Sequence, residues 1–269
     1  MSTNWEDREV LGEVWNGKIP AMFSLAEQDC SGETSPPPCC VMLPRMSYLP
    51  LATDKVRKHF SGHLSSSATT DMWFSFHGTP LRWHHPIGLL YDVWANNNPD
   101  SNMLPWRLTV HFSQFPTDTL LPCQTRDQVE TVFMSSLKEA DQLKHSGKIV
   151  SQMQKKDHNQ LWLGLTSDKF DQFWAINRKL MEPHGEESFK HIPIRFYLAG
   201  VDNSGQLTSN IVQRLISPDQ SLGEVMASMG WDNARVVTQG ISPDLTTPIL
   251  WLSRHLSYPD NFLHIVIVI

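Results

Sequence analysis

The chain has 269 residues, of which 40% are hydrophobic and 19% charged, and its formal net charge is -6. This length is enough for two or three small domains or one large one, and the composition suits a soluble globular protein with real cores. The acidic balance argues against a protein that binds nucleic-acid phosphates. No apolar run is long enough to span a bilayer, and the N-terminus lacks the pattern of a secretory signal.

The four cysteines form no disulfide pattern. Cys30, Cys39, Cys40 and Cys123 show no C-x-x-C spacing, so a reducing, cytoplasmic compartment is the simplest interpretation. The adjacent pair Cys39 and Cys40 could include a nucleophile. Both lie in a predicted strand with no base nearby, which favours small core residues.

Residues 1–16 are predicted to form a short N-terminal helix. Thr3 and Glu6 have the T-x-x-E spacing of a capping box, and apolar residues follow at helical spacing until Asn16. Trp5 and Trp15 on this helix could pack against the chain's own domains or against a partner, and packing within the chain is the simpler expectation.

Residues 17–115 are predicted to form a mixed α/β domain. The pattern predicts strands at 19–25, 39–49, 71–76 and 108–112, helical segments at 54–60 and 87–94, and polar loops at 29–38, 62–70 and 96–102. Taken alone this assignment is weak, but residues 186–269 repeat the same order.

Residues 186–269 predict a ubiquitin-like domain of the β-grasp fold. Strands are expected at 191–198, 211–216, 235–238 and 262–269, with helical segments at 221–229 and 248–256. Strand, strand, helix, strand, helical turn, strand is the order found in ubiquitin. The last segment, FLHIVIVI, is continuously apolar, as expected of a strand in the middle of a sheet.

Residues 116–185 predict a helix-rich domain of three helices. A T-x-x-Q capping box at Thr125 starts the first, Ser146 and Gly147 end it, a second is expected at 149–165, and a third runs from Ser167 to Pro183. The predicted fold class is therefore α+β. Two ubiquitin-like β-grasp domains (17–115 and 186–269) flank a helix-rich domain (116–185), and a short helix (1–16) precedes them.

The motifs of common enzymes are absent from the sequence. It contains no phosphate-binding glycine loop and no G-x-S-x-G element. The pairs His59/His63 and His84/His85 lack the glutamate of a zinc-protease motif, so histidines at the edge of a core are the simpler interpretation. We therefore expect no catalytic residue, no metal site and no cofactor.

Lys138 stands out by its position on the first central helix. At about 100° per residue it falls nearly opposite the apolar face of Val129, Phe133, Leu137 and Ala140, whereas Lys144 falls closer to that face. An amine on a rigid exposed helix suits covalent modification, although a solvated lysine is the ordinary interpretation. The sequence ends at IVIVI, inside the last predicted strand, without the glycine tail of a donor modifier. A scaffold or an acceptor is therefore expected.

Several long segments carry a family resemblance. TDKVRKHF, GTPLRWHHPIGLLYD, LPWRLTVHF, FMSSLKEADQLKH, QMQKKDH, FDQFWAINRKLM and LSYPDNFLHI, in this order, closely resemble the autophagy protein five family. The resemblance implies two ubiquitin-like domains around a helix-rich one. It also implies an amide link to the ubiquitin-like autophagy protein twelve at the lysine of M-S-x-x-K-E-A-D, which is Lys138 here.

The resemblance further implies partners and a place of action. Members bind the N-terminal helix of the coiled-coil autophagy protein sixteen, and Asp92 in GLLYD is the residue expected near the groove for that helix. With conjugating enzymes of the lipidation pathway, the assembly promotes transfer of a ubiquitin-like protein to phosphatidylethanolamine during autophagosome formation. The protein is then expected in the cytoplasm, recruited peripherally to preautophagosomal membranes. The loops at 30–38 and 96–103 are longer than the family pattern, which affects only contacts made by loops.

Two alternatives remain open on the sequence alone. The chain could be an interaction adaptor that needs no conjugation, or a ligase in which one cysteine carries a thioester. In the leading interpretation the chain is a conjugated scaffold without an active site of its own.

Overall fold

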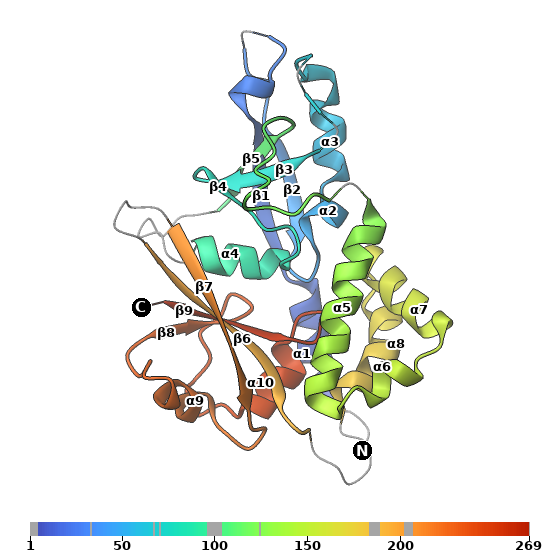
Figure 1. Ribbon diagram of the computed structural model, residues 1–269, viewed down its shortest axis with the longest axis vertical. Coiled ribbons are helices and arrows are strands. Elements are labelled where there is room, and N and C mark those ends of the chain that lie inside the picture. The colour runs from blue at the N-terminus through green and yellow to red at the C-terminus, as the bar shows by residue number, and fades with distance from the viewer. Residues whose placement is uncertain are drawn as a thin grey trace.

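The computed structural model contains two β-grasp lobes that meet directly and a helical hub packed along one side of them (Figure 1). It describes residues 5–32, 34–66, 68–69, 71–95, 104–123, 125–182, 189–201 and 207–268. The predicted cap at Thr3, the polar loop at 96–103 and the predicted stop at 183–185 lie outside these residues. The fold class, two ubiquitin-like domains around a helix-rich domain, is confirmed.

The first lobe is built on a five-stranded sheet in the order β2-β1-β5-β3-β4. Strand β1 pairs in parallel with β5, and the other pairings are antiparallel. Alternate residues of β1, including Phe23, join helical residues such as Phe60 and Ile87 in the core of this lobe. Its elements are β1 (Lys18–Leu25), η1 (Glu27–Asp29), β2 (Cys39–Pro44), α2 (Leu49–Ala52), α3 (Asp54–Phe60), η2 (Ser61–His63), β3 (Trp73–Phe76), β4 (Thr79–Pro80), α4 (Ile87–Ala95) and β5 (Trp106–His111).

Two strands of the first lobe are shorter than predicted: β3 begins at Trp73 instead of residue 71, and β2 is shortened at its other end. The apolar run 39–49 predicted a single strand, but β2 ends at Pro44 and a separate short helix, α2, begins at Leu49. Between them Arg45 and Ser47 accept backbone hydrogen bonds from Gly88 and Ile87 of α4. The backbone therefore leaves the sheet to bind a helix, and hydrophobic periodicity does not signal such a contact.

The second lobe has a four-stranded sheet in the order β7-β6-β9-β8. The predicted central position of the last strand is confirmed, because β9 pairs in parallel with β6 and antiparallel with β8. All residues of β9 except the last are buried, as its apolar sequence requires. Its elements are β6 (Ile192–Val201), β7 (Leu207–Ile216), α9 (Leu222–Ser228), β8 (Arg235–Val237), α10 (Ile249–Leu256) and β9 (Leu263–Val268).

The helical hub has four helices among the described residues instead of the three predicted. They are α5 (Arg126–His145), α6 (Lys148–Gln152), α7 (Lys155–Thr166) and α8 (Phe170–Met181). The Thr125–Gln128 capping box and the break at Ser146 and Gly147 are confirmed. The predicted second helix is interrupted after Gln152, because Gln154 and Asp157 form a capping box of their own and start α7.

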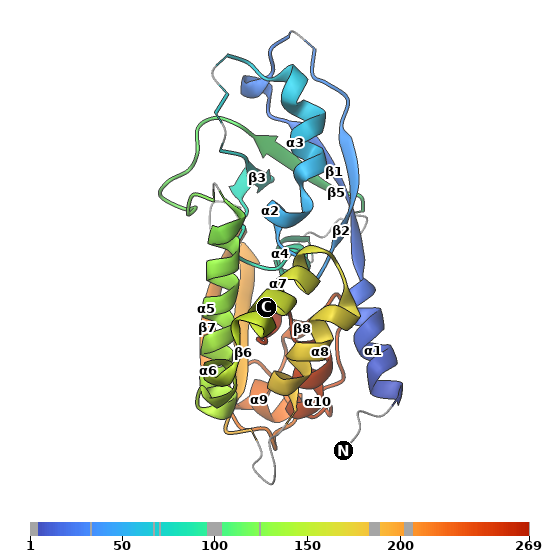
Figure 2. The same cartoon turned by 90° about the vertical axis from the view of Figure 1, so that its right-hand side faces the viewer.

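Helices α7 and α8 approach each other very closely in the hub (Figure 2). A Cβ at Gly164 would come within 2.6 Å of the backbone nitrogen of Phe173, so the crossing requires glycine at this position. The N-terminal helix α1 (Trp5–Asn16) packs on this side of the molecule. Trp15 is buried against Phe170 and Phe173 of α8, so the expectation that it packs within the chain is confirmed.

A buried ion pair joins the two lobes. Nη2 of Arg45, at the end of β2, lies 2.5 Å from Oδ2 of Asp92 in α4. The same carboxylate oxygen accepts a 2.9 Å hydrogen bond from the backbone N–H of Gly240, which belongs to the second lobe. Gly240 has φ of +78°, and a Cβ there would lie 3.2 Å from Nη1 of Arg45. The turn that donates this N–H therefore favours glycine on two grounds.

We predict that Asp92→Ala destabilises the protein far more than Asp54→Ala. Both carboxylates lie 2.5 Å from an arginine, but the Arg45–Asp92 pair is buried and the Arg126–Asp54 pair is exposed. Loss of Asp92 leaves a buried guanidinium without its carboxylate, at a cost of about 3–5 kcal/mol. Loss of Asp54 costs at most about 1 kcal/mol. Equal losses in the free energy of unfolding, measured with urea, would contradict this assignment.

Candidate functional site

Helix α5 carries the lysine that the sequence singled out. Val129, Phe133, Leu137 and Ala140 are buried on its inner face, as predicted from their spacing. Lys138 is exposed on the opposite side. A helical side chain covers the turn N-terminal to its own Cα, so Lys138 extends over the turn that contains Ser135.

Two small hydroxyl residues precede Lys138 on the exposed side of α5. They are Thr131 and Ser135. Their hydroxyl groups donate hydrogen bonds of 2.8 Å to the carbonyls of Asp127 and Thr131, one turn earlier in the helix. These hydroxyls are thus turned toward the helix backbone. The exposed side chain of Lys138 is open to solvent beside them.

The residue after Lys138 attaches this turn of the helix to the second lobe. Oε2 of Glu139 accepts a 2.7 Å hydrogen bond from Nη2 of Arg195 in β6. Its Oε1 accepts a 3.0 Å bond from Nε2 of Gln213 in β7. The guanidinium of Arg195 also lies 3.7 Å from the centre of the Phe262 ring. Lys138 is thus held on a part of α5 that cannot move independently of the sheet.

A second lysine on the same helix has the opposite environment. The side chain of Lys144 is 2% exposed, and its Nζ lies 3.1 Å from Sδ of Met181 and 5.4 Å from the centre of the Phe189 ring. Burial lowers the pKa of Lys144 to about 7, because desolvation disfavours the charged amine. Lys144 has the more readily neutral amine but is sealed, so access distinguishes Lys138 from it.

Asp92 lies inside the protein. It was expected near a groove for a partner helix, but its side chain is 1% exposed and faces Arg45 and Gly240. Burial raises the pKa of the Asp92 carboxyl and the adjacent guanidinium opposes that shift. A role of Asp92 in partner binding stays a prediction. Its position means that such a role would act through the packing of the two lobes.

Two of the four cysteines, Cys39 and Cys123, lack the environment of a nucleophile. Burial raises the pKa of Cys123 to about 11 and also raises that of Cys39, whereas a reactive thiol needs a lowered pKa. Cys39 and Cys40 lie in β2, as predicted. The expectation that both are core residues is wrong for Cys40, which is exposed on this outer strand.

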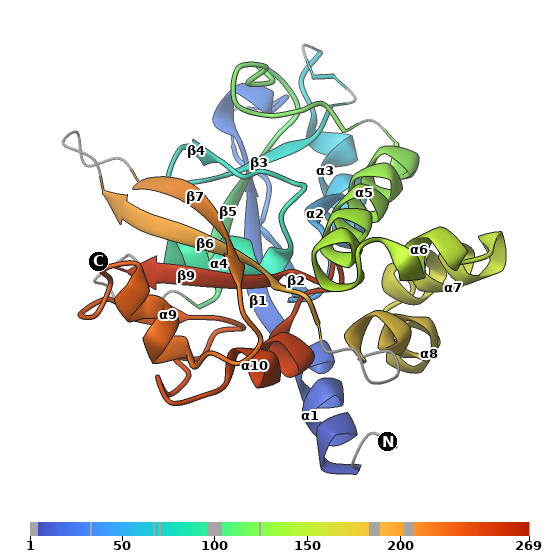
Figure 3. The same cartoon turned by 60° about the horizontal axis from the view of Figure 1, so that its bottom comes forward.

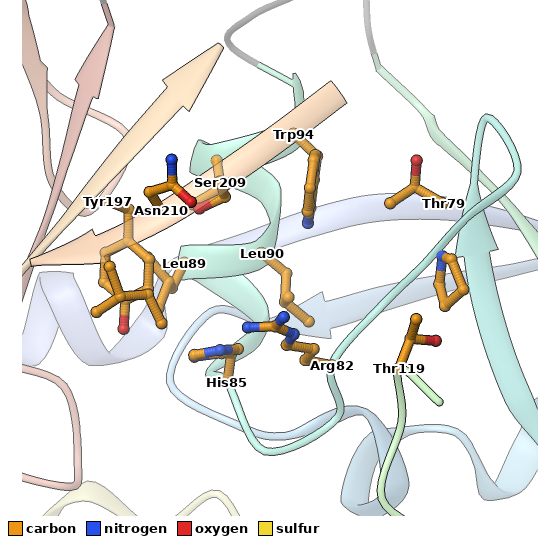
Figure 4. Close-up of a pocket in the computed structure, with 13 residues that line it drawn as sticks. Thr79, Arg82, His85, Leu89, Leu90, Trp94, Thr119, Tyr197, Ser209 and Asn210 are labelled. Atoms are coloured by element: carbon orange, nitrogen blue, oxygen red, sulfur yellow. The ribbon is translucent and has the colours of Figure 1, made fainter. Parts of the chain in front are cut away.

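A cavity of about 360 Å³ lies between α4 and strands β6 and β7. Figure 4 shows Trp94 at one end of it, Arg82 beside His85, and Tyr197 with Ser209 and Asn210 on the second lobe. Burial lowers the pKa of His85 well below its ordinary value, so this ring is neutral near pH 7. Arg82 is then the charged side chain among the described residues that line the cavity. Local sequence patterns do not predict this site, because its two walls are about 120 residues apart in the chain.

The described part of the chain contains neither a metal-binding cluster nor a membrane-spanning helix. Among those residues no group of three His, Cys, Asp or Glu side chains is arranged to hold a metal ion. The described helices include none with the length and apolar character needed to cross a bilayer.

Comparison with known proteins matches three successive parts of the chain to one family. The chain matches the family models described as Autophagy protein ATG5, UblA domain, over residues 14–112; alpha-helical bundle region, over 126–183; and UblB domain, over 191–267. It is 49% identical to Autophagy protein 5 of Drosophila melanogaster over 270 residues, which cover 96% of each chain. It is 34% identical to Autophagy-related protein 5 of Caenorhabditis elegans, with 98% of each chain covered.

The fold also matches a solved structure. Kluyveromyces marxianus Atg5 superposes with a TM-score of 0.81, covering 97% of this chain and 99% of that one, at 20% sequence identity. At this identity the match supports the fold alone, including the arrangement of both lobes around the hub.

We predict that Lys144→Met raises the free energy of unfolding by about 1–4 kcal/mol near pH 6, because methionine fills a similar volume without a buried charge. The pKa of Lys144 is about 7 in the folded chain and near 10.5 when unfolded. The unfolded chain therefore binds more protons between these values, and wild-type stability rises with pH across this range.

The advantage of Lys144→Met should accordingly be largest at about pH 6 and smallest at about pH 10. Urea unfolding of both proteins at several pH values measures it. Lys138→Met, which changes an exposed side chain, serves as the control and should leave stability within about 0.5 kcal/mol. A difference between wild type and Lys144→Met that does not change with pH would contradict a buried, titrating amine.

Proposed function

This chain belongs to the autophagy protein 5 family, and from that premise we propose that it is a scaffold modified covalently at Lys138. The role in autophagy follows from the family. In our proposal the C-terminal glycine of a ubiquitin-like protein, autophagy protein twelve, is carried as a thioester on a conjugating enzyme; the neutral amine of Lys138 attacks the thioester, the isopeptide bond forms and the enzyme's thiol leaves. The observation that carries the proposal is the exposed position of Lys138 on a helix that is fixed to both lobes.

The surroundings of Lys138 support an acceptor role. An acceptor amine must enter the active site of a conjugating enzyme while it is part of a large folded protein. The small side chains of Thr131 and Ser135, whose hydroxyl groups bond to the helix backbone, leave room for this approach. The Glu139–Arg195 bond keeps the turn from moving once the modifier is attached. A fixed attachment point limits the orientations of the modifier, which is what a scaffold needs.

We propose that the conjugate acts by positioning. With the helix of the coiled-coil autophagy protein sixteen it would form a ligase-like assembly that is recruited from the cytoplasm to preautophagosomal membranes. There it would hold a loaded conjugating enzyme so that a ubiquitin-like protein is transferred to phosphatidylethanolamine. Bringing the two reactants together in a favourable geometry can supply a large part of a rate enhancement without any catalytic side chain. Asp92 would contribute by fixing the angle between the lobes.

Two alternatives have less support. A thioester-forming ligase would need an activated thiol, but burial raises the pKa of both Cys39 and Cys123. An adaptor without conjugation would place no demand on a single surface lysine.

We predict that Lys138→Arg abolishes the conjugate and the lipidation that depends on it, since arginine keeps the charge but offers no amine of comparable nucleophilicity. The variant is to be expressed in cells that lack the endogenous protein. Tryptic mass spectrometry should find a branched peptide at Lys138 in the wild type. Lys148→Arg, which replaces an exposed lysine on α6, is the matched control and should retain conjugation. Normal lipidation in the Lys138→Arg cells would favour the adaptor.

A second prediction separates the scaffold from a thioester ligase. A variant in which Cys30, Cys39, Cys40 and Cys123 are all replaced by serine should keep both the conjugate and lipidation, because no thiol takes part. Its urea unfolding is measured in parallel, so that a loss caused by misfolding is recognised. A folded quadruple variant without lipidation would support the thioester ligase instead.

A further inference from the structure

The outer edge of β7 is long, accessible and regular. Strand β7 runs over Leu207–Ile216 and pairs along its whole length with β6. It lies at the border of the four-stranded sheet, with no strand on its other side in the described part of the chain (Figure 3). Ile211 is 44% exposed and Leu215 62%. Edges of this kind present unpaired backbone N–H and C=O groups on alternate residues and accept further strands.

The same edge forms one wall of the cavity beside α4. Three consecutive residues of β7, from Ser209 to Ile211, line this cavity. Side chains alternate between the two faces of a strand, so Ser209 and Ile211 share the face that Tyr197 of β6 turns to the cavity, and the presence of Asn210 in the lining shows that the cavity reaches the edge of β7. A segment added beside β7 would therefore lie over the cavity, and every second side chain of that segment would point toward α4.

The residues that line the cavity indicate which side chains an added peptide strand should carry. Its opposite wall is apolar, with Leu90, Val93 and Trp94 from α4. A volume of about 360 Å³ falls within the roughly 300–1,000 Å³ of sites that enclose organic groups, so an indole or phenyl ring fits. Arg82 is exposed at this wall and has no acidic partner among the described residues. A guanidinium at such a wall is suited to bind a carboxylate in a bidentate manner.

We propose that β7 binds an extended acidic peptide segment of a partner protein as an added strand. An aromatic side chain of the segment occupies the cavity between β7 and α4, and a neighbouring carboxylate binds Arg82. Backbone hydrogen bonds to β7 supply affinity, and the cavity and the arginine supply specificity. This interaction is separate from conjugation and requires nothing of Lys138.

The probe is the fluorescein-labelled peptide Glu-Asp-Trp-Val-Asp-Val, and binding to the full chain is followed by fluorescence anisotropy. Wild type should bind it, and Ile211→Lys should weaken binding at least about tenfold, because the lysine enters the site of the aromatic ring. Leu215→Lys is the matched control. It lies on the same face of the same strand and is more exposed, but it is outside the cavity, so affinity should change less than about twofold. Equal binding by wild type and Ile211→Lys would overturn the proposal.

Two further experiments test the charge and the strand geometry. Arg82→Glu should lose the acidic peptide and gain a peptide in which lysines replace its acidic residues. Two N-methylated versions of the peptide are compared, one methylated at the odd-numbered nitrogens and one at the even-numbered nitrogens. Only one version should lose binding, because only the N–H groups of alternate residues face β7. Loss of binding with both versions, or no effect of Arg82→Glu, would contradict strand addition.

A second copy of this chain is the competing occupant of the edge. Light scattering of the full chain without peptide should therefore show a monomer. A dimer that Ile211→Lys dissociates would replace our proposal with pairing of β7 between two copies. Lys138→Arg should bind the peptide as the wild type does, so the outcome is independent of the proposed conjugation.

Discussion

The arrangement of the molecule depends on one buried ion pair. Each β-grasp lobe has its own apolar core, and a third core is shared between the lobes and the hub. Apolar packing is not directional, so it does not by itself fix the angle between two lobes. The Arg45–Asp92 pair and the Gly240 N–H supply direction, because a buried charge that loses its partners carries a large desolvation cost. Any rotation that separates Gly240 from Asp92 is disfavoured for this reason.

Helix α5 fixes the position of Lys138 relative to the two lobes, because it is bonded to both. Its first residue, Arg126, binds Asp54 of the first lobe, and Glu139 binds Arg195 of the second. The first of these bonds is exposed and weak, so the apolar face of α5 and the partly buried Arg195 contribute most of the attachment. Lys138 and Lys144 lie on the same helix and differ in access. Lys144 is buried and has a pKa of about 7, so under the proposed conjugation the exposure of the amine matters more than its protonation state.

Much of the fold could be predicted from local patterns, because hydrophobic periodicity reports which side chains face a core. It predicted the central position of β9 and the inward and outward faces of α5, including Lys138. It failed where a long-range contact or an unusual cap decides the structure. Strand β2 stops at Pro44 so that the backbone beyond it can bind α4, and α7 starts at Gln154, a residue type that is rarely used as a cap. Arg45, Asp92 and Gly240 meet only in the folded chain, and so do the walls of the cavity beside β7.

One side chain, Gln213, links the turn that contains Lys138 to the edge strand β7. Gln213 of β7 donates a hydrogen bond to Glu139, the residue after Lys138, and it lies two positions from Ile211 at the cavity. A strand added to β7 would stabilise the strand that contains Gln213. A modifier attached to Lys138 would lie next to Glu139, to which Gln213 is hydrogen-bonded. Coupling between sites requires an element on which both act, and β7 with its Glu139 contact is such an element. Because linkage is reciprocal, any effect of one occupant on the affinity of the other must act equally in both directions.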